Sequence, residues 1–295
     1  WCLCYLIAIL PRCVRYGALT PFVAFILRSV VHYRRYVIFK QLHDSFPEKS
    51  DVEINEIGRR YYRHLAEMII ETLSLAGMNE KRRREITEFD LPEEFYEQIE
   101  GRNFIAMSSH YGFWETALNI YLATPNHYFV VAYRPLSNRI MDKLLRRMRN
   151  TPSADVVPSK QLMRHFIANR NGIDGKNLIV GLISDQNCPR TKGCCWHKFL
   201  RHDTLFFDGG EQLAVKFGLP VYYMELERIE AGRYRHNYTL LYDGKEEVKP
   251  HEITERYVRC LERTIVERPE YWMWSHRRWK YYPDPVTGEP IYKAR

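Results

Sequence analysis

The sequence contains no uninterrupted apolar run near the ~20 residues that a membrane-spanning helix requires. Its two most apolar stretches cover residues 1–10 and 18–31, and Pro11, Arg15 and Pro21 break the pattern. No small-residue cleavage site follows the first stretch, which argues against a cleaved signal peptide. We therefore expect a truncated membrane anchor, or helices that lie in the membrane interface with arginines at the headgroups. A pair of buried core helices is the alternative.

The cysteines follow no regular spacing. Three of the seven lie in the apolar start, three in one loop and one alone near the C-terminus, unlike the disulfide framework of a secreted domain. We therefore expect a reducing compartment and free thiols. A zinc site could draw on Cys188, Cys194, Cys195 and His197, but their spacing fits no usual zinc finger, and adjacent cysteines chelate one ion poorly. The sequence favours free loop thiols and predicts no metal or cofactor.

Internal repeats, low-complexity tracts and long linkers are also missing, so the 295 residues form one large domain or two small ones. A composition with 45% hydrophobic and 27% charged residues is ordinary for a folded protein. The basic stretch at residues 32–40 suits the anionic cytoplasmic leaflet of a membrane. We expect an apolar, membrane-associated section over residues 1–45 and a single domain over residues 46–295.

The charge balance is basic, with 44 Lys and Arg against 36 Asp and Glu and a net charge of +8. Such a balance favours an acidic partner, which can be nucleic acid, an anionic membrane surface or an acidic carrier protein. A nucleic-acid binder would also explain the Trp- and Arg-rich residues 272–282, because aromatic rings beside arginines suit single strands. It would leave the apolar start unexplained, so we expect no nucleic-acid partner.

Short apolar strands alternate with helical stretches after a long helix predicted over residues 51–78, with Asp51 as its cap and Gly77 as its stop. This alternation is typical of βαβ units, and it predicts an α/β fold with a mixed, largely parallel sheet flanked by helices. The last strand is expected to be antiparallel. The expected strands cover residues 103–109, 127–133, 154–159, 177–184, 219–229 and 233–244.

Polar side chains follow three of these strands. His110, Arg134 and Asp185 come directly after or shortly after the strand ends. In open α/β sheets the chemistry takes place at the carboxyl ends of the strands. We therefore expect these three residues to converge on one edge of the sheet.

Glu115 follows His110 by five residues, an offset of about 140° on a regular helix. The two side chains can meet only if His110 lies in a strand-to-helix turn, which Gly112 permits, and Glu115 lies in the first helical turn. The imidazole would then take a proton from an attacking hydroxyl while the carboxylate holds its other nitrogen. The alternatives are a solvated loop before an amphipathic helix and, less favoured, a triad centred on Ser108 or Ser109.

Residues 108–115, Ser-Ser-His-Tyr-Gly-Phe-Trp-Glu, resemble the catalytic block of the late acyltransferases of lipid A biosynthesis, the lauroyl and myristoyl transferases. That family is part of the lysophospholipid acyltransferase superfamily, whose signature is His-x-x-x-x-Asp/Glu. Further similar blocks follow in order and cover about residues 5–282, including a Tyr-Arg-Pro block and an Asp-Gln block. The resemblance implies a fold like that of the glycerolipid acyltransferases.

The resemblance implies an O-acyltransferase at the cytoplasmic face of the inner membrane. It would move a fatty acyl chain from an acyl carrier protein thioester to a hydroxyl of a lipid A precursor, without a covalent intermediate. His110 would be the general base and Glu115 its partner, and Arg134, Asp185 and Glu211 would contribute to substrate binding. The alternatives are an organising role for Asp185 in its loop and a place in the first turn of a helix for Glu211.

Other functions stay open from the sequence. The acceptor could be another membrane lipid, such as a lysophospholipid or an aminolipid, and the donor could be coenzyme A. A membrane scaffold without activity would explain the apolar start but not the polar residues at the strand ends.

Overall fold

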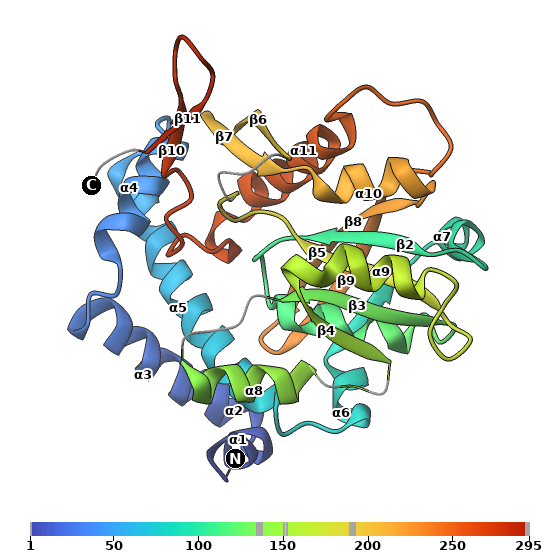
Figure 1. Ribbon diagram of the computed structural model, residues 1–295. Coiled ribbons are helices and arrows are strands. Elements are labelled where there is room, and N and C mark those ends of the chain that lie inside the picture. Colours follow the sequence, from blue (N-terminus) through green and yellow to red (C-terminus); the bar gives the residue numbers. More distant parts are fainter. Residues whose placement is uncertain (1, 134–137, 150, 152, 189–192, 293–295) are drawn as a thin grey trace.

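The computed structural model describes residues 2–133, 138–149, 151, 153–188 and 193–292 (Figure 1). Its centre is a sheet of seven strands: β1 (Thr87–Asp90), β2 (Phe104–Ser108), β3 (His127–Tyr133), β4 (Ala154–Pro158), β5 (Asn177–Ile183), β8 (Val221–Glu230) and β9 (Arg233–Tyr242). The order is β1-β9-β8-β2-β5-β3-β4, and the neighbours are parallel except for β8 and β9. The predicted α/β fold, with its mixed and largely parallel sheet and its antiparallel late strand, is confirmed.

Two short antiparallel hairpins lie outside this sheet, and neither was predicted from the sequence. The hairpins are β6 (Cys194–Phe199) with β7 (His202–Phe207), and β10 (Tyr281–Pro283) with β11 (Pro290–Tyr292).

Helices cover both faces of the central sheet, because successive side chains of a strand point to opposite faces. In β2, Phe104 and Ala106 belong to one hydrophobic cluster, whereas Ile105 and Met107 belong to the other. The first cluster is completed by α7 (Glu93–Ile99) and the 3-10 helix η3 (Trp114–Leu122), and the second by α9 (Leu162–Asn169), α10 (Gly209–Phe217) and α11 (Glu252–Glu267).

The longest helix, α5 (Asp51–Leu75), packs against the N-terminal helices and the C-terminal segment. Its cap is Ser50 rather than the predicted Asp51. The Ser50 hydroxyl accepts the backbone N–H of Glu53, and the Glu53 carboxylate accepts the backbone N–H of Ser50, so two unpaired donors are satisfied. Helices elsewhere in the chain are α4 (Arg35–Ser45), α6 (Glu80–Glu85), α8 (Arg139–Arg149), η4 (Ser159–Gln161) and η5 (Pro269–Tyr271), besides the N-terminal helices.

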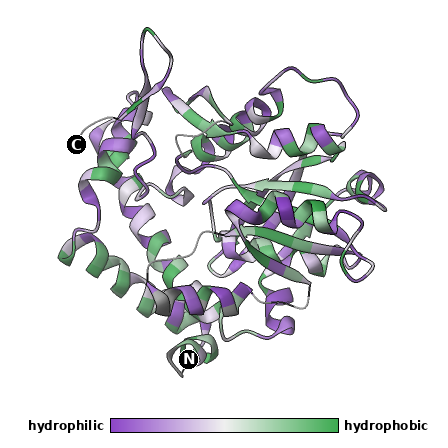
Figure 2. Ribbon diagram, viewed as in Figure 1, coloured by the Kyte–Doolittle hydropathy of each residue, from purple (hydrophilic) through white to green (hydrophobic). Residues whose placement is uncertain are grey.

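Helical backbone runs continuously from Arg12 to Val30, through α2 (Arg12–Val14), the π-turn η1 (Arg15–Leu19), α3 (Thr20–Phe25) and the π-turn η2 (Ile26–Val30). The π-helical turn before Pro21 accommodates the missing N–H of that residue, so the chain is interrupted at Pro11, as expected, but not at Arg15 or Pro21. By length and composition alone, this 19-residue stretch could cross a membrane. Figure 2 shows apolar residues along α3 at the periphery as well as on the central strands.

Candidate active site

The register of two neighbouring strands brings His110 and Asp185 together. β2 and β5 are parallel, with Ser108 opposite Ile183, and each polar residue lies two positions beyond the end of its strand. The backbone N–H of Ser184 donates to the carbonyl oxygen of Ser108 at 3.2 Å, which continues the pairing beyond the strands. Both side chains therefore leave the sheet at its carboxyl edge, where α/β sheets place their chemistry.

Asp185 holds the His110 imidazole in one orientation. Its Oδ1 lies 2.7 Å from His110 Nδ1, while its Oδ2 accepts the His110 backbone N–H at 3.0 Å and the Trp272 indole N–H at 2.9 Å. The residue is buried, and burial alone would raise its pKa, but the charge of His110 and these hydrogen bonds prevail and lower the pKa of Asp185. An ionised Asp185 places the imidazole hydrogen on Nδ1 and leaves the lone pair on Nε2.

The outer nitrogen of His110, Nε2, is the atom that can act as a base. The side-chain nitrogen of Gln186 lies 3.2 Å from it, in position to donate a hydrogen bond to the lone pair. The His110 side chain keeps 18% of its surface exposed. Its ring contacts the ring of Trp114 edge to face, with centroids 4.9 Å apart. A hydroxyl that displaces the Gln186 amide would reach the base directly.

The turn that carries His110 is braced by the segment after α11. The backbone N–H of Met273 donates to the His110 carbonyl, and the N–H of Gly112 donates to the Tyr271 carbonyl, both at 3.1 Å. Gly112 has a φ of +60°, and a Cβ at this position would lie 2.6 Å from the backbone oxygen of Leu226. Only glycine fits there, which confirms the predicted role of Gly112 in the turn.

The structure does not pair Glu115 with His110, so that prediction is wrong. The two Glu115 oxygens accept hydrogen bonds from Nε and Nη2 of Arg149 at 2.9 and 2.5 Å. The two residues form a bidentate ion pair between η3 and α8. Successive side chains on a 3-10 helix point about 120° apart. Because Trp114 packs against the His110 ring, Glu115 faces a different direction and meets Arg149 instead.

The structure describes two of the three residues that were predicted to bind substrate. Arg134 lies outside the described residues. Asp185 gives its oxygens to His110 and Trp272, so it orients the candidate base rather than its own loop, and its contact with substrate stays a prediction. Glu211 is buried in the first turn of α10, and its Oε2 accepts the backbone N–H and the hydroxyl of Thr254 at 2.9 and 2.6 Å. That carboxylate links α10 to α11, in agreement with the alternative interpretation for Glu211.

Gln186, Trp272 and His276 surround the histidine and carboxylate, although the sequence reasoning assigned them no role. Burial, the largest cause, lowers the pKa of His276 to about 4, so its ring is neutral at neutral pH. Its Nε2 lies 2.7 Å from the side-chain nitrogen of Asn187. Their positions in the sequence could have indicated these residues. Gln186 and Asn187 directly follow Asp185, and Trp272 and His276 lie in the Trp- and Arg-rich stretch.

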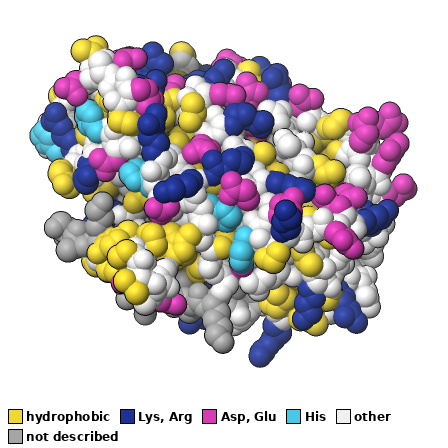
Figure 3. All heavy atoms as spheres, turned by 90° about the horizontal axis from the view of Figure 1, so that it is seen from above, with side chains coloured by type: hydrophobic (Ala, Val, Ile, Leu, Met, Phe, Trp, Pro, Cys, Tyr) yellow, Lys and Arg dark blue, Asp and Glu magenta, His cyan; other side chains and the backbone are white. Residues whose placement is uncertain are grey.

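Two of the tryptophans that suggested nucleic-acid binding are buried. Trp272 and Trp274 are 2% and 0% exposed, so their rings cannot stack on bases. Their indole N–H groups donate to Asp185 and to the Pro269 carbonyl. On the face in Figure 3, Lys and Arg side chains alternate with Asp and Glu instead of forming one basic surface.

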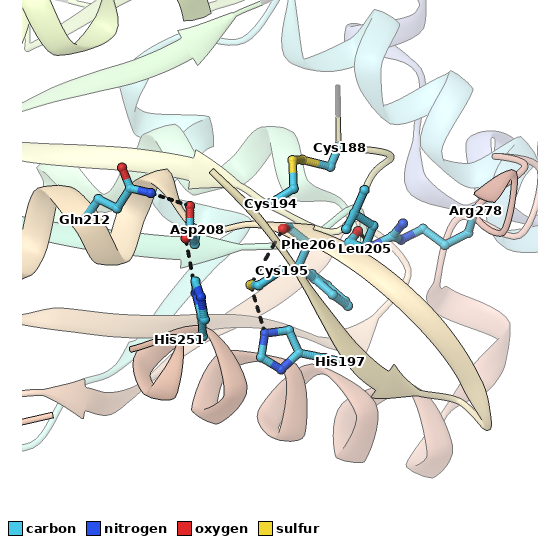
Figure 4. The surroundings of a disulfide bond; sticks show 10 residues. All are labelled: Cys188, Cys194, Cys195, His197, Leu205, Phe206, Asp208, Gln212, His251 and Arg278. Atoms are coloured by element: carbon cyan, nitrogen blue, oxygen red, sulfur yellow. Dashed lines mark hydrogen bonds and ion pairs between the residues drawn. A yellow bond between two sulfur atoms is a disulfide. The ribbon is translucent and has the colours of Figure 1, made fainter. Parts of the chain in front are cut away.

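Cys188 and Cys194 form a disulfide, so the prediction of free loop thiols is wrong for this pair (Figure 4). The start of β6 returns to the end of the segment after β5, and the two Cα atoms are 6.4 Å apart, within the range that a disulfide bridges. Cys195 is a free, buried thiol, because adjacent strand residues point to opposite faces. Two of the four zinc ligands considered from the sequence, Cys188 and Cys194, are thus taken up by the disulfide.

One of the comparisons with known proteins identifies a family for this chain. The family model of bacterial lipid A biosynthesis acyltransferases matches residues 2–281, which include both strands that position His110 and Asp185. None of the curated proteins compared with the chain matches it. Because the family match extends over nearly all of the sequence, the chain belongs to the bacterial lipid A biosynthesis acyltransferase family and is an acyltransferase.

Proposed function

We propose that this enzyme moves a fatty acyl chain from an acyl carrier protein thioester to a hydroxyl of a lipid A precursor, at the cytoplasmic face of the inner membrane. The observation that carries the proposal is the His110–Asp185 pair, with its partly exposed Nε2 at the carboxyl edge of the sheet. The family match supports acyl transfer to lipid A.

The proposed reaction uses His110 first as a base and then as an acid. Nε2 takes the proton of the acceptor hydroxyl while the hydroxyl oxygen attacks the thioester carbonyl carbon. The ionised Asp185 stabilises the imidazolium that forms. The attack forms the ester C–O bond, and collapse of the tetrahedral intermediate re-forms the carbonyl double bond and breaks the C–S bond. The proton then passes from His110 to the departing thiolate, which leaves His110 neutral.

A covalent acyl-enzyme is not part of the proposal. The hydroxyl of Ser108 is buried and donates to the carbonyl oxygen of Met224 at 3.1 Å. Ser109 is also buried. A direct attack by the acceptor on the thioester needs neither serine, because the acyl group is already activated.

Lipid mass spectrometry tests the proposed function. Lipid A from cells that lack this gene should be short of one acyl chain, and the intact chain should restore it, whereas the His110→Ala variant should not. The mass difference would also report the acyl length. A lipid A profile unaffected by the gene, with a change in a phospholipid or an aminolipid instead, would refute lipid A as the acceptor.

We propose that the N-terminal section, residues 1–45, holds the enzyme at the membrane. Helices α1 (Cys2–Ile9) and α3 pack on α5, yet they leave many large apolar side chains in solvent. Such side chains beside arginines are typical of a segment in or through a membrane interface. The large apolar residues of this section that are exposed include Tyr5, Leu6, Ile9, Val14, Phe22, Phe25, Val30, Val31, Tyr33 and Tyr36.

Phe22→Asp combined with Phe25→Asp should therefore move the protein from vesicles to the aqueous fraction in flotation with anionic liposomes. Both phenylalanines are more than half exposed, so the substitutions should spare the fold. Val286→Asp is the matched control, because Val286 is 91% exposed and lies outside the N-terminal section. Unchanged flotation of the double variant would contradict the membrane role of α3.

The net charge of +8 favours an acidic carrier protein over coenzyme A as donor. Complementary charge mainly raises the encounter rate, and salt screens it within about 8 Å at physiological ionic strength. Raising the salt concentration should lower kcat/KM for acyl-carrier donors by roughly tenfold and leave kcat nearly unchanged. Arg146→Glu with Arg147→Glu on α8 should have the same effect, whereas Arg164→Glu on α9 is the control.

Steady-state kinetics with acyl carrier protein and coenzyme A thioesters distinguish the two possible donors. Equal use of acyl-coenzyme A, with no salt effect on kcat/KM, would overturn the assignment of the carrier protein. If charge reversal on α8 changes only liposome flotation, then these arginines contact anionic lipid rather than the donor.

A further inference from the structure

We propose that Cys195, Asp208 and His251 form a divalent-metal site suited to Zn²⁺, with His197 as the fourth ligand. The site uses none of the groups that hold or surround His110. It would be structural, because it would fasten the β6–β7 hairpin to α10 and α11.

The ligand atoms already lie near one another. The Cys195 sulfur, an Asp208 oxygen and an imidazole nitrogen of His251 are all within 4.8 Å of each other. Asp208 Oδ2 is 3.1 Å from His251 Nδ1, and His197 Nε2 is 3.0 Å from Cys195 Sγ. Figure 4 shows His251 directed toward Asp208 and His197 directed toward Cys195. A tetrahedral zinc ion, with bonds of roughly 2.0–2.3 Å, holds its ligand atoms about 3.3–3.8 Å apart, so the three groups would draw slightly closer as the ion binds. His197 lies close to the Cys195 sulfur but outside this group of three, and its ring would have to approach the other two ligands on binding.

The donor set matches the chemistry of zinc. One thiolate, two imidazoles and one carboxylate combine the soft and borderline ligands that zinc accepts, whereas Mg²⁺ and Ca²⁺ prefer oxygen. Binding would replace the thiol proton of Cys195, which would be released to solvent. The disulfide between Cys188 and Cys194 occupies the two neighbouring thiols and leaves Cys195 as the sulfur ligand of the loop.

Groups around the ligands hold them as in known metal sites. Gln212 Nε2 donates to Asp208 Oδ1 at 2.7 Å, which leaves Oδ2 toward His251. Glu255 pairs with Nδ1 of His197, which leaves Nε2 for coordination. Metal-binding histidines usually give their second nitrogen to a carboxylate or carbonyl, and ligating carboxylates are themselves hydrogen-bonded.

The ligands come from three segments that are distant in the sequence. Cys195 lies on β6, Asp208 is between β7 and α10, and His251 precedes α11. His251 has a φ of +68°, which is uncommon for a residue other than glycine. This backbone conformation, in a residue at the start of α11, directs the imidazole toward Asp208.

Metal titration of the full chain tests the proposal. The detergent-purified protein, freed of metal by a chelator without reductant, should bind one Zn²⁺ per chain. Co²⁺ should give a thiolate-to-metal absorption band in the intact protein and none in Cys195→Ser. His251→Ala should raise the Kd for Zn²⁺ by roughly 100-fold or more, and Gln212→Ala by roughly 10–100-fold. Zn²⁺ should also raise the Tm by a few degrees in the intact chain but not in His251→Ala.

Matched variants separate this site from others. Cys260→Ser on α11 and His43→Ala on α4 should bind Zn²⁺ like the intact chain, as should a variant with both Cys188 and Cys194 replaced by Ser. The His251 side chain is 48% exposed, so His251→Ala should fold, and circular dichroism checks this. The proposal fails if no stoichiometric Zn²⁺ binds, if the cobalt band survives in Cys195→Ser, or if His251→Ala binds like the intact chain.

Discussion

Replacement of His110 by alanine is expected to lower kcat by roughly 10²–10⁴-fold, because a positioned general base contributes about that much to proton transfer. Asp185→Asn should cost nearly as much, since the amide can no longer stabilise the imidazolium and can favour the wrong tautomer. Rates of acyl transfer from an acyl carrier protein thioester measure both effects. His43→Ala, at an exposed position on α4, is the control and should retain full activity.

The double variant His110→Ala with Asp185→Asn should be little worse than either single variant, because the two residues act as one unit. Multiplication of the two losses would mean that they act independently. A fully active His110→Ala enzyme would refute the mechanism. Circular dichroism should accompany the kinetics, because Asp185 is buried and also accepts the Trp272 indole N–H.

Six of the seven strands could be predicted because they are short, mostly apolar runs, and the antiparallel β9 follows β8 through a short connection. Strand β1 was not predicted, because its four residues Thr-Glu-Phe-Asp do not form an apolar run. The β6–β7 hairpin could not be predicted, because its turn lacks the usual sequence signal. Leu200 and Arg201 form its turn at φ values of 47° and 68°, without the Asn-Gly or Asp-Gly pair that usually marks such a turn. The buried positions of β6 include Cys195 and His197, and the sequence pattern indicated a loop at these residues.

The sequence indicated at which strand ends the site residues lie, but not which carboxylate pairs with His110. Equal offsets of His110 and Asp185 from the ends of adjacent parallel strands place them side by side, and both offsets are visible in the sequence. The choice of Glu115 relied on closeness in sequence, which cannot show where a side chain points. The 3-10 geometry of η3 decides that direction, and an ordinary α-helix was expected there. Trp272 reaches Asp185 from 87 residues away, a contact beyond any local pattern.

The ion pair between Glu115 and Arg149 predicts the second large effect, this one on stability. Their side chains are 7% and 16% exposed, so either charge left alone would be largely shielded from water. Removing one partner of a buried pair costs about 3–5 kcal/mol, whereas replacing both by apolar residues of similar volume can be neutral. We therefore expect Glu115→Gln and Arg149→Met each to lower the free energy of unfolding by about 3–5 kcal/mol. The variant with Glu115→Leu and Arg149→Met together should recover much of that loss.

Denaturant unfolding of the single and double variants gives the coupling energy between Glu115 and Arg149, and the same cycle with His110→Ala gives the coupling between Glu115 and His110. The contacts predict a large first value and a second value near zero, because Glu115 hydrogen-bonds Arg149 and not His110. The reverse result would restore Glu115 as the partner of the base. Activity adds a second test: if Glu115 acts only by holding η3 and α8 together, then Glu115→Gln should lose kcat through misplacement of these elements. The doubly apolar variant should regain that activity together with stability, which a carboxylate needed for the chemistry would not allow.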